Sequence, residues 1–335
     1  MAHIVLRPRW QARENDVTSE HTYRNRRQFI QELGLGAIGM AALGAMGCSM
    51  TSFGPLDTIP DNAPREGYPA ARNEAFSVPE RAVTGRIYAS SYNNFYEFDG
   101  ASKEIWPLTE PYEPFPMTIR VRGLVEKRLT FDVAELIRTM DIEERLYRFR
   151  CVEAWAMTVP WTGFPLSKLI ERCKPLSRAT HVRFVSVNRP NQMEGIRKQH
   201  WYPWPYYEAL RMDEAMNELA FVVTGMYGEP LPKQNGSPLR LALPWKYGYK
   251  GPKAIVRIEF TDSQPGTFWN DLQPLEYGFL SNVNPNIPHP RWSQATETLL
   301  EIDERVPTQI FNGYDEWVSA LYPGEPRQPG RPLAR

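Results

Sequence analysis

The chain has 335 residues, and its 39 Lys and Arg balance 39 Asp and Glu, so the formal net charge is zero. This balance excludes the usual kind of nucleic-acid-binding protein, in which basic residues are in excess and gather on one face. The 31 prolines and 10 tryptophans predict short elements joined by long ordered loops rather than a helical bundle.

The first fifty residues have the pattern of an export signal. Arg26 and Arg27 precede an apolar, glycine-rich run over residues 33–47. This run is shorter than the stretch of about 20 apolar residues that a membrane-spanning helix needs. We interpret residues 1–50 as a twin-arginine signal peptide that directs the protein to the periplasm. Cys48 then either leaves with the signal or is a lipidation site, and a short buried helix is the alternative interpretation of the run.

The rest of the chain is expected to form one domain. Residues 51–80 are rich in Pro, Asp, Asn and Arg, and they predict an extended lead-in. Residues 81–335 contain no clear linker, so we expect a single domain with an extended C-terminal segment.

Strand and helix patterns follow one another without a fixed order. A strand is predicted over 117–125, and a helix directly after it, with Thr130 as its N-cap and Val133, Leu136 and Ile137 on one face. The remaining predicted elements are a strand at 144–152, a helix at 165–173 and strands at 181–187, 219–224, 238–244 and 254–260. Because strands and helices do not alternate strictly, the predicted fold class is α+β, with mixed sheets and short helices.

Cys151 lies at the end of the predicted strand 144–152, and four interpretations of its thiol are open. It could form a disulfide with Cys173, be an inert buried thiol, act as a nucleophile, or bind a metal. Arg148 and Arg150 precede it, and their positive charge is expected to lower the pKa of the thiol and favour a metal-binding thiolate. Both arginines alternate with hydrophobic neighbours, so on an ideal strand they would face away from the thiol.

Two loop regions have the composition of a cofactor site. Residues 233–255 combine glycines with cations, and such loops hold anions such as phosphate. The alternative for this region is an ordinary solvated loop. Residues 90–98 gather side chains that can read the edge of a heterocycle, and a β-turn between aromatic core residues is the alternative there. The polar residues of this second region are Asn93, Asn94, Tyr96 and Glu97.

Together these stretches resemble a known family. The matching segments are YNNFYEF, RxRCVEAWxMxVPWxGFPL, LPxQNGxPxRLxxPWKYGxKGxKxI and SNVNPNIPHPRWSQATE. They are similar to the MsrP (YedY) family of periplasmic protein-methionine-sulfoxide reductase catalytic subunits, a branch of the molybdoenzymes with the sulfite oxidase fold. The resemblance extends from the twin-arginine signal to about residue 317, whereas residues 188–210 match the family only loosely.

The resemblance implies a Mo-molybdopterin cofactor and gives roles to individual residues. Cys151 would bind molybdenum through its thiolate, so it is the metal ligand and a catalytic residue. Arg148 or Arg150 is expected to polarise the substrate or bind the cofactor. The positions that would bind the molybdopterin and its phosphate are Asn93, Tyr96, Glu97, Ser186, Asn235, Arg240, Gly251, Pro252 and Lys253.

The implied fold is the sulfite oxidase-like molybdopterin-binding fold. The implied activity is the repair of methionine sulfoxide in oxidised periplasmic proteins by oxygen-atom transfer to reduced molybdenum. The chain contains no CxxCH haem motif, and the resemblance implies that the membrane haem protein MsrQ and the quinone pool supply the electrons. We expect a monomer or a transient heterodimer. The alternatives are a sulfite oxidase-like enzyme, another sulfoxide or N-oxide oxygen transferase, and a non-catalytic binding module.

Overall fold

The computed structural model of the protein describes residues 54–328. The predicted signal peptide and Cys48 lie outside the described residues. Residues 54–80 consist mostly of turns, and all described residues belong to one compact unit. Within the described part of the chain, no helix is both long and apolar enough to span a membrane.

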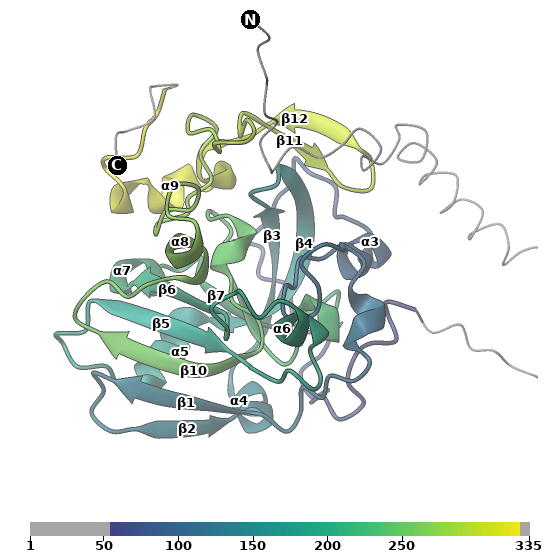
Figure 1. The fold of residues 1–335 in the computed structure, drawn as a ribbon, viewed down its shortest axis with the longest axis vertical. Coiled ribbons are helices and arrows are strands. Elements are labelled where there is room, and N and C mark those ends of the chain that lie inside the picture. Colours follow the sequence, from purple (N-terminus) through teal and green to yellow (C-terminus); the bar gives the residue numbers. More distant parts are fainter. Residues whose placement is uncertain (1–53, 329–335) are drawn as a thin grey trace, which may run out of the picture. The chain divides into compact units, whose positions relative to one another are not determined.

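Two mixed β-sheets organise the described residues (Figure 1). The five-stranded sheet has the spatial order β2 (Leu129–Asp132), β1 (Thr118–Gly123), β10 (Ile255–Thr261), β5 (His181–Ser186) and β6 (Tyr207–Arg211). Strand β1 runs parallel to β10, and the other neighbours in this sheet are antiparallel. Buried residues alternate with more exposed ones along β1, so one face of this strand packs on the core.

The second sheet is built around β4 (Trp155–Pro165), in which every residue but the last is buried. A run of this kind belongs to a strand that is covered on both faces. Strand β3 (Glu143–Arg150) pairs with β4 along its full length, from Glu143 opposite Gly163 to Arg150 opposite Ala156. The other strands of this sheet are β7 (Phe221–Met226), β8 (Glu229–Pro230), β9 (Arg240–Ala242), β11 (Thr296–Leu299) and β12 (Glu304–Pro307).

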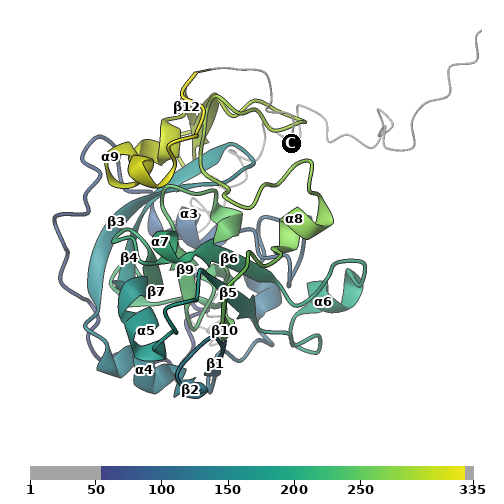
Figure 2. The same cartoon turned by 90° about the vertical axis from the view of Figure 1, so that its left-hand side faces the viewer.

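The helices are short, and with the mixed sheets they confirm the predicted α+β class. Figure 2 shows α6 and α8 on the same side of the sheets. The helices are α3 (Arg86–Ser91), α4 (Val133–Thr139), α5 (Leu166–Cys173), α6 (Glu194–Lys198), α7 (Met212–Ala215), α8 (Phe268–Leu272) and α9 (Asp315–Val318). The 3₁₀ turns are η2 (Trp106–Thr109), η3 (Lys233–Asn235), η4 (Gly248–Lys250), η5 (Ile310–Gly313) and η6 (Ser319–Leu321).

The predicted N-cap of the helix after β1 is wrong. Thr130 lies within β2, opposite Arg120, and the helix begins only at Val133. The chain stays extended as far as Asp132 because β2 pairs with β1. The Oδ1 atom of Asp132 then accepts the backbone N–H of Glu135 at 2.9 Å and caps the helix. The apolar face predicted for this helix is buried.

Candidate functional site

A cavity of about 340 Å³ lies where segments far apart in the sequence meet. Its wall combines residues 89–97, the turn that follows β3, the central part of β4 and the loops around residues 235–253. The structure therefore brings together most of the site residues predicted from the sequence. Those that line the cavity are Asn93, Tyr96, Glu97, Cys151, Asn235, Arg240 and Lys253.

Cys151 is positioned by the tight turn that follows β3. Its backbone N–H donates to the carbonyl of Trp155 at 2.9 Å, and its carbonyl accepts the N–H of Ala154 at 3.1 Å. Its Sγ accepts the N–H of Glu153 at 3.4 Å and the Nδ2 group of Asn94 at 3.6 Å. The turn thus presents the sulfur to the cavity, with polar donors beside it.

The disulfide interpretation of Cys151 does not hold. Both Cys151 and Cys173 are free and buried. Cys173 is the last residue of α5 and does not line the cavity. The two thiols therefore have separate environments, and only Cys151 belongs to the site.

The predicted lowering of the Cys151 pKa is wrong. Burial, together with the negative charge of Glu153, raises the pKa of this thiol to about 12, and Lys103 and Arg150 only partly oppose the rise. Burial is a property of the tertiary structure, which the local charge pattern does not reveal. A bound metal ion would instead lower the pKa of this thiol, because a coordinating thiol is deprotonated outright.

Arg148 and Arg150 do not line the cavity, and the expectation that one of them contacts substrate or cofactor stays a prediction. Arg150 is fully buried, its Nε lies 2.9 Å from Oε2 of Glu297, and its Nη1 donates to the carbonyl of Cys151. Arg148 forms an ion pair with Glu80. Both guanidinium groups fasten β3 and its turn to neighbouring segments, as the alternation along the strand had indicated.

Two asparagines on the cavity wall keep a buried acceptor without a protein partner. The Nδ2 groups of Asn93 and Asn235 both donate to the carbonyl of Ala89, at 3.3 and 2.9 Å. Among the described residues, nothing donates to the Oδ1 atom of either side chain. A buried acceptor left unpaired is costly, so these atoms match a ligand that brings N–H or O–H donors.

The same wall carries two buried cations. Arg240 and Lys253 line the cavity near Glu97. Burial lowers the pKa of Arg240 to about 10, and burial together with Arg240 lowers that of Lys253. Burial also raises the pKa of Glu97. The charged forms of both cations are thus disfavoured in the protein alone, and an anionic group in the cavity would stabilise them.

Three predicted contact residues lie outside the cavity lining: Ser186, Gly251 and Pro252. Ser186 ends β5, and its hydroxyl is buried without a partner among the described residues. The carbonyl of Pro252 accepts the N–H of Leu241 at 3.0 Å. A Cβ on Gly251 would come within 2.5 Å of the carbonyl oxygen of Leu241, so only glycine fits there. These two residues shape the loop that presents Lys253.

A polar cluster around Glu153 was not singled out from the sequence. The Oε2 atom of this cavity-lining residue accepts from Nζ of Lys103 at 2.6 Å, Nδ2 of Asn94 at 3.1 Å and Nε1 of Trp155 at 3.1 Å. Burial alone would raise the pKa of Glu153, but these donors hold it below its ordinary value. The available sequence signal was the carboxylate placed two positions after Cys151.

The remaining wall is aromatic, and sequence reasoning missed it because its members come from separate strands, loops and a short helix. The aromatic lining residues are Tyr92, Phe149, Trp155, Trp161, Tyr206, Tyr249, Trp269, Tyr277 and Trp292. The site thus combines a polar and cationic wall with an aromatic one.

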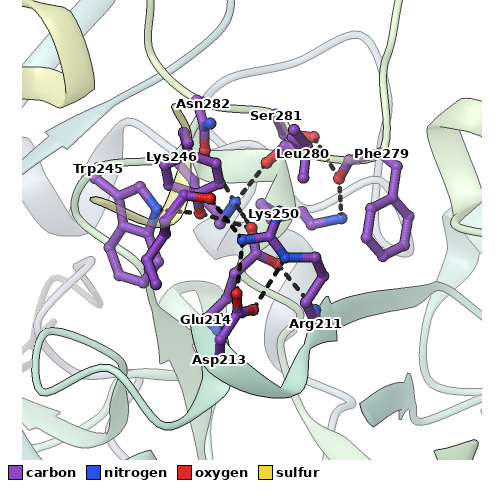
Figure 3. Close-up of polar contacts among 12 residues, drawn as sticks. Arg211, Asp213, Glu214, Trp245, Lys246, Lys250, Phe279, Leu280, Ser281 and Asn282 are labelled. Atoms are coloured by element: carbon purple, nitrogen blue, oxygen red, sulfur yellow. Dashed lines mark hydrogen bonds and ion pairs between the residues drawn. The ribbon is translucent and has the colours of Figure 1, made fainter. Parts of the chain in front are cut away.

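Two buried lysines fasten the loop of residues 279–282 (Figure 3). Nζ of Lys246 lies 2.7 Å from Oε1 of Glu214 and donates to two oxygens of residues 279–282, at 2.7 and 3.0 Å. Nζ of Lys250 donates to a backbone carbonyl of the same residues, at 2.5 Å. These contacts fix residues 279–282, which begin two positions after Tyr277 in the sequence. Tyr277 lines the cavity.

The donor set indicates what the cavity can hold. It offers one thiol, unpaired amide acceptors and buried cations. An organic ligand with N–H donors and an anionic group would satisfy the amides and cations, and a metal carried by this ligand would bind the thiolate. Within residues 54–328, no group of three or more His, Cys, Asp or Glu side chains is placed to hold a metal ion.

Comparison with known proteins agrees with this donor set. Residues 109–269 match the family described as the oxidoreductase molybdopterin binding domain. The protein-methionine-sulfoxide reductase catalytic subunit MsrP of Burkholderia mallei is 43% identical over 314 residues, which cover 92% of either chain. The protein of the same name from Gluconobacter oxydans is 44% identical over 316 residues, covering 92% of this chain and 94% of the relative.

Among solved structures, the sulfane dehydrogenase SoxCD from Paracoccus pantotrophus matches with a TM-score of 0.42 and 14% sequence identity. The match covers 76% of this chain and 68% of that chain. The family match over residues 109–269 confirms the predicted molybdopterin-binding fold.

Proposed function

The chain belongs to the family of protein-methionine-sulfoxide reductase catalytic subunits, MsrP, and we propose that it reduces methionine sulfoxide side chains in oxidised proteins. It is a molybdopterin-dependent oxidoreductase, and Mo-molybdopterin is its cofactor. The observation that carries the proposal is the placement of the Cys151 thiol, the unpaired amides and the buried cations on one cavity wall.

The cavity residues fit this cofactor. When bound, Mo-molybdopterin supplies a metal centre capable of two-electron oxygen-atom transfer. Cys151 is placed to provide the protein's sulfur ligand to that metal. The free acceptors of Asn93 and Asn235 suit the N–H groups of the pterin, and Arg240 and Lys253 suit its phosphate.

The aromatic wall suits the substrate. Reduction of a sulfoxide consumes two electrons and two protons, and it yields a thioether and water. Methionine side chains pack favourably against aromatic rings, and Tyr96, Trp269 and Tyr277 offer such rings in the cavity. These rings would hold the methyl end of the side chain and keep bulk water from the reacting atoms.

Rapid turnover of methionine sulfoxide by the molybdenum-loaded protein is the direct test. A reduced viologen dye serves as the electron donor, and its oxidation is followed by absorbance after methionine sulfoxide is added. We expect bleaching that depends on both the protein and the sulfoxide. Metal-loaded protein that oxidises sulfite but leaves the dye unchanged would contradict the proposal and favour the sulfite oxidase-like alternative.

We further propose that the protein works in the periplasm and receives its electrons from a membrane haem subunit, MsrQ, linked to the quinone pool. The pattern around Arg26 and Arg27 and the lack of a CxxCH motif in the sequence support this proposal. The relatives are named catalytic subunits, which implies a second subunit. A monomer that meets its partner transiently fits these features. Lysine at both arginine positions should retain the protein in the cytoplasmic fraction, and unchanged export would contradict the signal assignment.

Removing the charge of Lys253 should weaken cofactor retention. The Lys253→Met variant keeps the length of the side chain but loses the cation that faces the cavity beside Arg240. Loss of a group that supports a bound metal cofactor typically costs about 10- to 100-fold in affinity. We expect the purified variant to contain much less molybdenum and pterin, measured by mass spectrometry of the metal and by pterin fluorescence.

Lys168→Met is the matched control for this experiment. Lys168 lies on α5, and its side chain is 60% exposed. It should retain the full content of metal and pterin. If the Lys253 variant retained the cofactor as well as this control does, the assignment of the phosphate contact would be wrong.

A further inference from the structure

Aromatic side chains continue from the cavity wall to the protein surface. Tyr96 and Trp269 line the cavity, and their ring centroids lie 5.0 Å apart. The ring of Tyr202 lies 6.0 Å from each of them. Trp201 follows at 5.9 Å from Tyr202, and 63% of its surface is exposed. The series of rings thus ends in a large apolar side chain in contact with solvent.

The segment that carries Trp201 is fastened to the cavity wall by hydrogen bonds. Nε2 of Gln199 donates to the carbonyl of Tyr96 at 3.0 Å, and the N–H of Ile196 donates to the carbonyl of Glu97 at 3.0 Å. Both acceptors belong to residues whose side chains line the cavity. The exposed ring is therefore held at a defined position relative to the cavity and does not sit at the tip of a free loop.

We propose that Trp201 and Tyr202 form a docking surface for an extended, unfolded segment of the oxidised protein, whose methionine sulfoxide side chain enters the cavity. This inference rests on the proposed function. A methionine side chain is short, so the substrate backbone must pass along the rim of the cavity. Unfolded segments expose the apolar side chains that an exposed tryptophan binds best, and tryptophan is enriched among residues that dominate binding.

The spacing of the rings predicts where the substrate is contacted. Steps of 5.9 and 6.0 Å separate Trp201 from Tyr202 and Tyr202 from Tyr96. Extended chain rises about 3.3 Å per residue, so at most about four residues cover this span. An apolar side chain three or four positions from the methionine sulfoxide would therefore meet Trp201.

Two synthetic peptides and free methionine sulfoxide test the inference. Each peptide carries one methionine sulfoxide, and a phenylalanine four residues away in the first peptide is replaced by serine in the second. With reduced viologen and the molybdenum-loaded enzyme, we expect a higher kcat/KM for the phenylalanine peptide. The Trp201→Ala variant should lower that value by about tenfold and remove the preference between the peptides. Fluorescence anisotropy of labelled peptide, measured without an electron donor, should show the same loss in binding.

The controls separate docking from catalysis and from folding. Trp201→Phe should restore most of the preference, and Ile302→Ala should leave all substrates unaffected, since Ile302 is 55% exposed in the turn between β11 and β12. An equal loss on free methionine sulfoxide and on both peptides would overturn the docking role. A change in oligomeric state without a change in peptide binding would also overturn it. If the wild-type enzyme reduced none of the substrates, the proposed function itself would fail.

Discussion

Serine in place of Cys151 is expected to abolish the reduction of methionine sulfoxide and the retention of molybdenum together. The substitution changes one atom in a turn that is otherwise held by the backbone hydrogen bonds of Trp155 and Ala154, so the fold should persist. An alcohol is a far weaker ligand than a thiolate for a soft metal centre. Changes to groups that only support metal ligands already cost about 10- to 100-fold, and loss of the ligand itself should exceed this range.

Cys173→Ala is the matched control, because Cys173 is also a free and fully buried thiol. It belongs to α5 and lies outside the cavity lining. We expect full metal content and turnover in this variant, with a small loss of stability from the cavity created. Metal content is measured by mass spectrometry and turnover by viologen oxidation. Activity and metal in the Cys151→Ser variant at the wild-type level would show that the metal ligand lies elsewhere.

The fold class and the polar half of the site could be predicted because their signals are local. Alternating and continuous apolar runs predicted β1, β3, β5, β7, β9 and β10. The longest strand, β4, was not predicted; it is buried on both faces and therefore shows no alternation. Short segments that combine amides, glycines and cations predicted Asn93, Asn235 and Lys253, which the structure places on one wall. Physical chemistry alone left a solvated loop and a β-turn open as alternatives to an anion site and a heterocycle site. The family resemblance was needed to choose between them and to name the cofactor.

The parts that could not be predicted depend on tertiary structure. Charge beside Cys151 in the sequence predicted a low pKa, but burial raises it. The aromatic wall draws Trp269 from the short helix α8 and Tyr277 from the loop that follows it, so no sequence pattern links them to the thiol. Thr130 was predicted to be the N-cap of the helix after β1. In the structure, pairing with β1 keeps Thr130 extended within β2. In each case an interaction made only in the folded chain overrode the local signal.

Replacing Lys246 by methionine is expected to destabilise the protein by about 3–5 kcal/mol, which is the usual cost of leaving a buried charge without its partner. Lys246 and Glu214 are both fully buried, and their Nζ and Oε1 atoms lie 2.7 Å apart (Figure 3). The same Oε1 also accepts the hydroxyl of Tyr322 at 2.6 Å. Methionine fills the space of the lysine stem but cannot neutralise the carboxylate. It also removes the donor that Lys246 provides to the carbonyl of Leu280 and to Oδ1 of Asn282. Denaturant unfolding at neutral pH measures the loss.

The dependence on pH and a second substitution distinguish this mechanism from simple loss of packing. Burial alone would raise the pKa of Glu214, but Lys246, Tyr322 and the backbone N–H of Arg211 hold it below its ordinary value of 4.5. A carboxylate whose pKa is lowered by folding contributes stability above pH 4.5, and that contribution is lost as the pH falls further. The difference in stability between wild type and Lys246→Met should therefore shrink in acid. Adding Glu214→Gln to the lysine variant should recover much of the loss, because the unpaired charge is then gone. A loss below about 1 kcal/mol in the single variant, as for an exposed ion pair, would contradict the buried-charge argument.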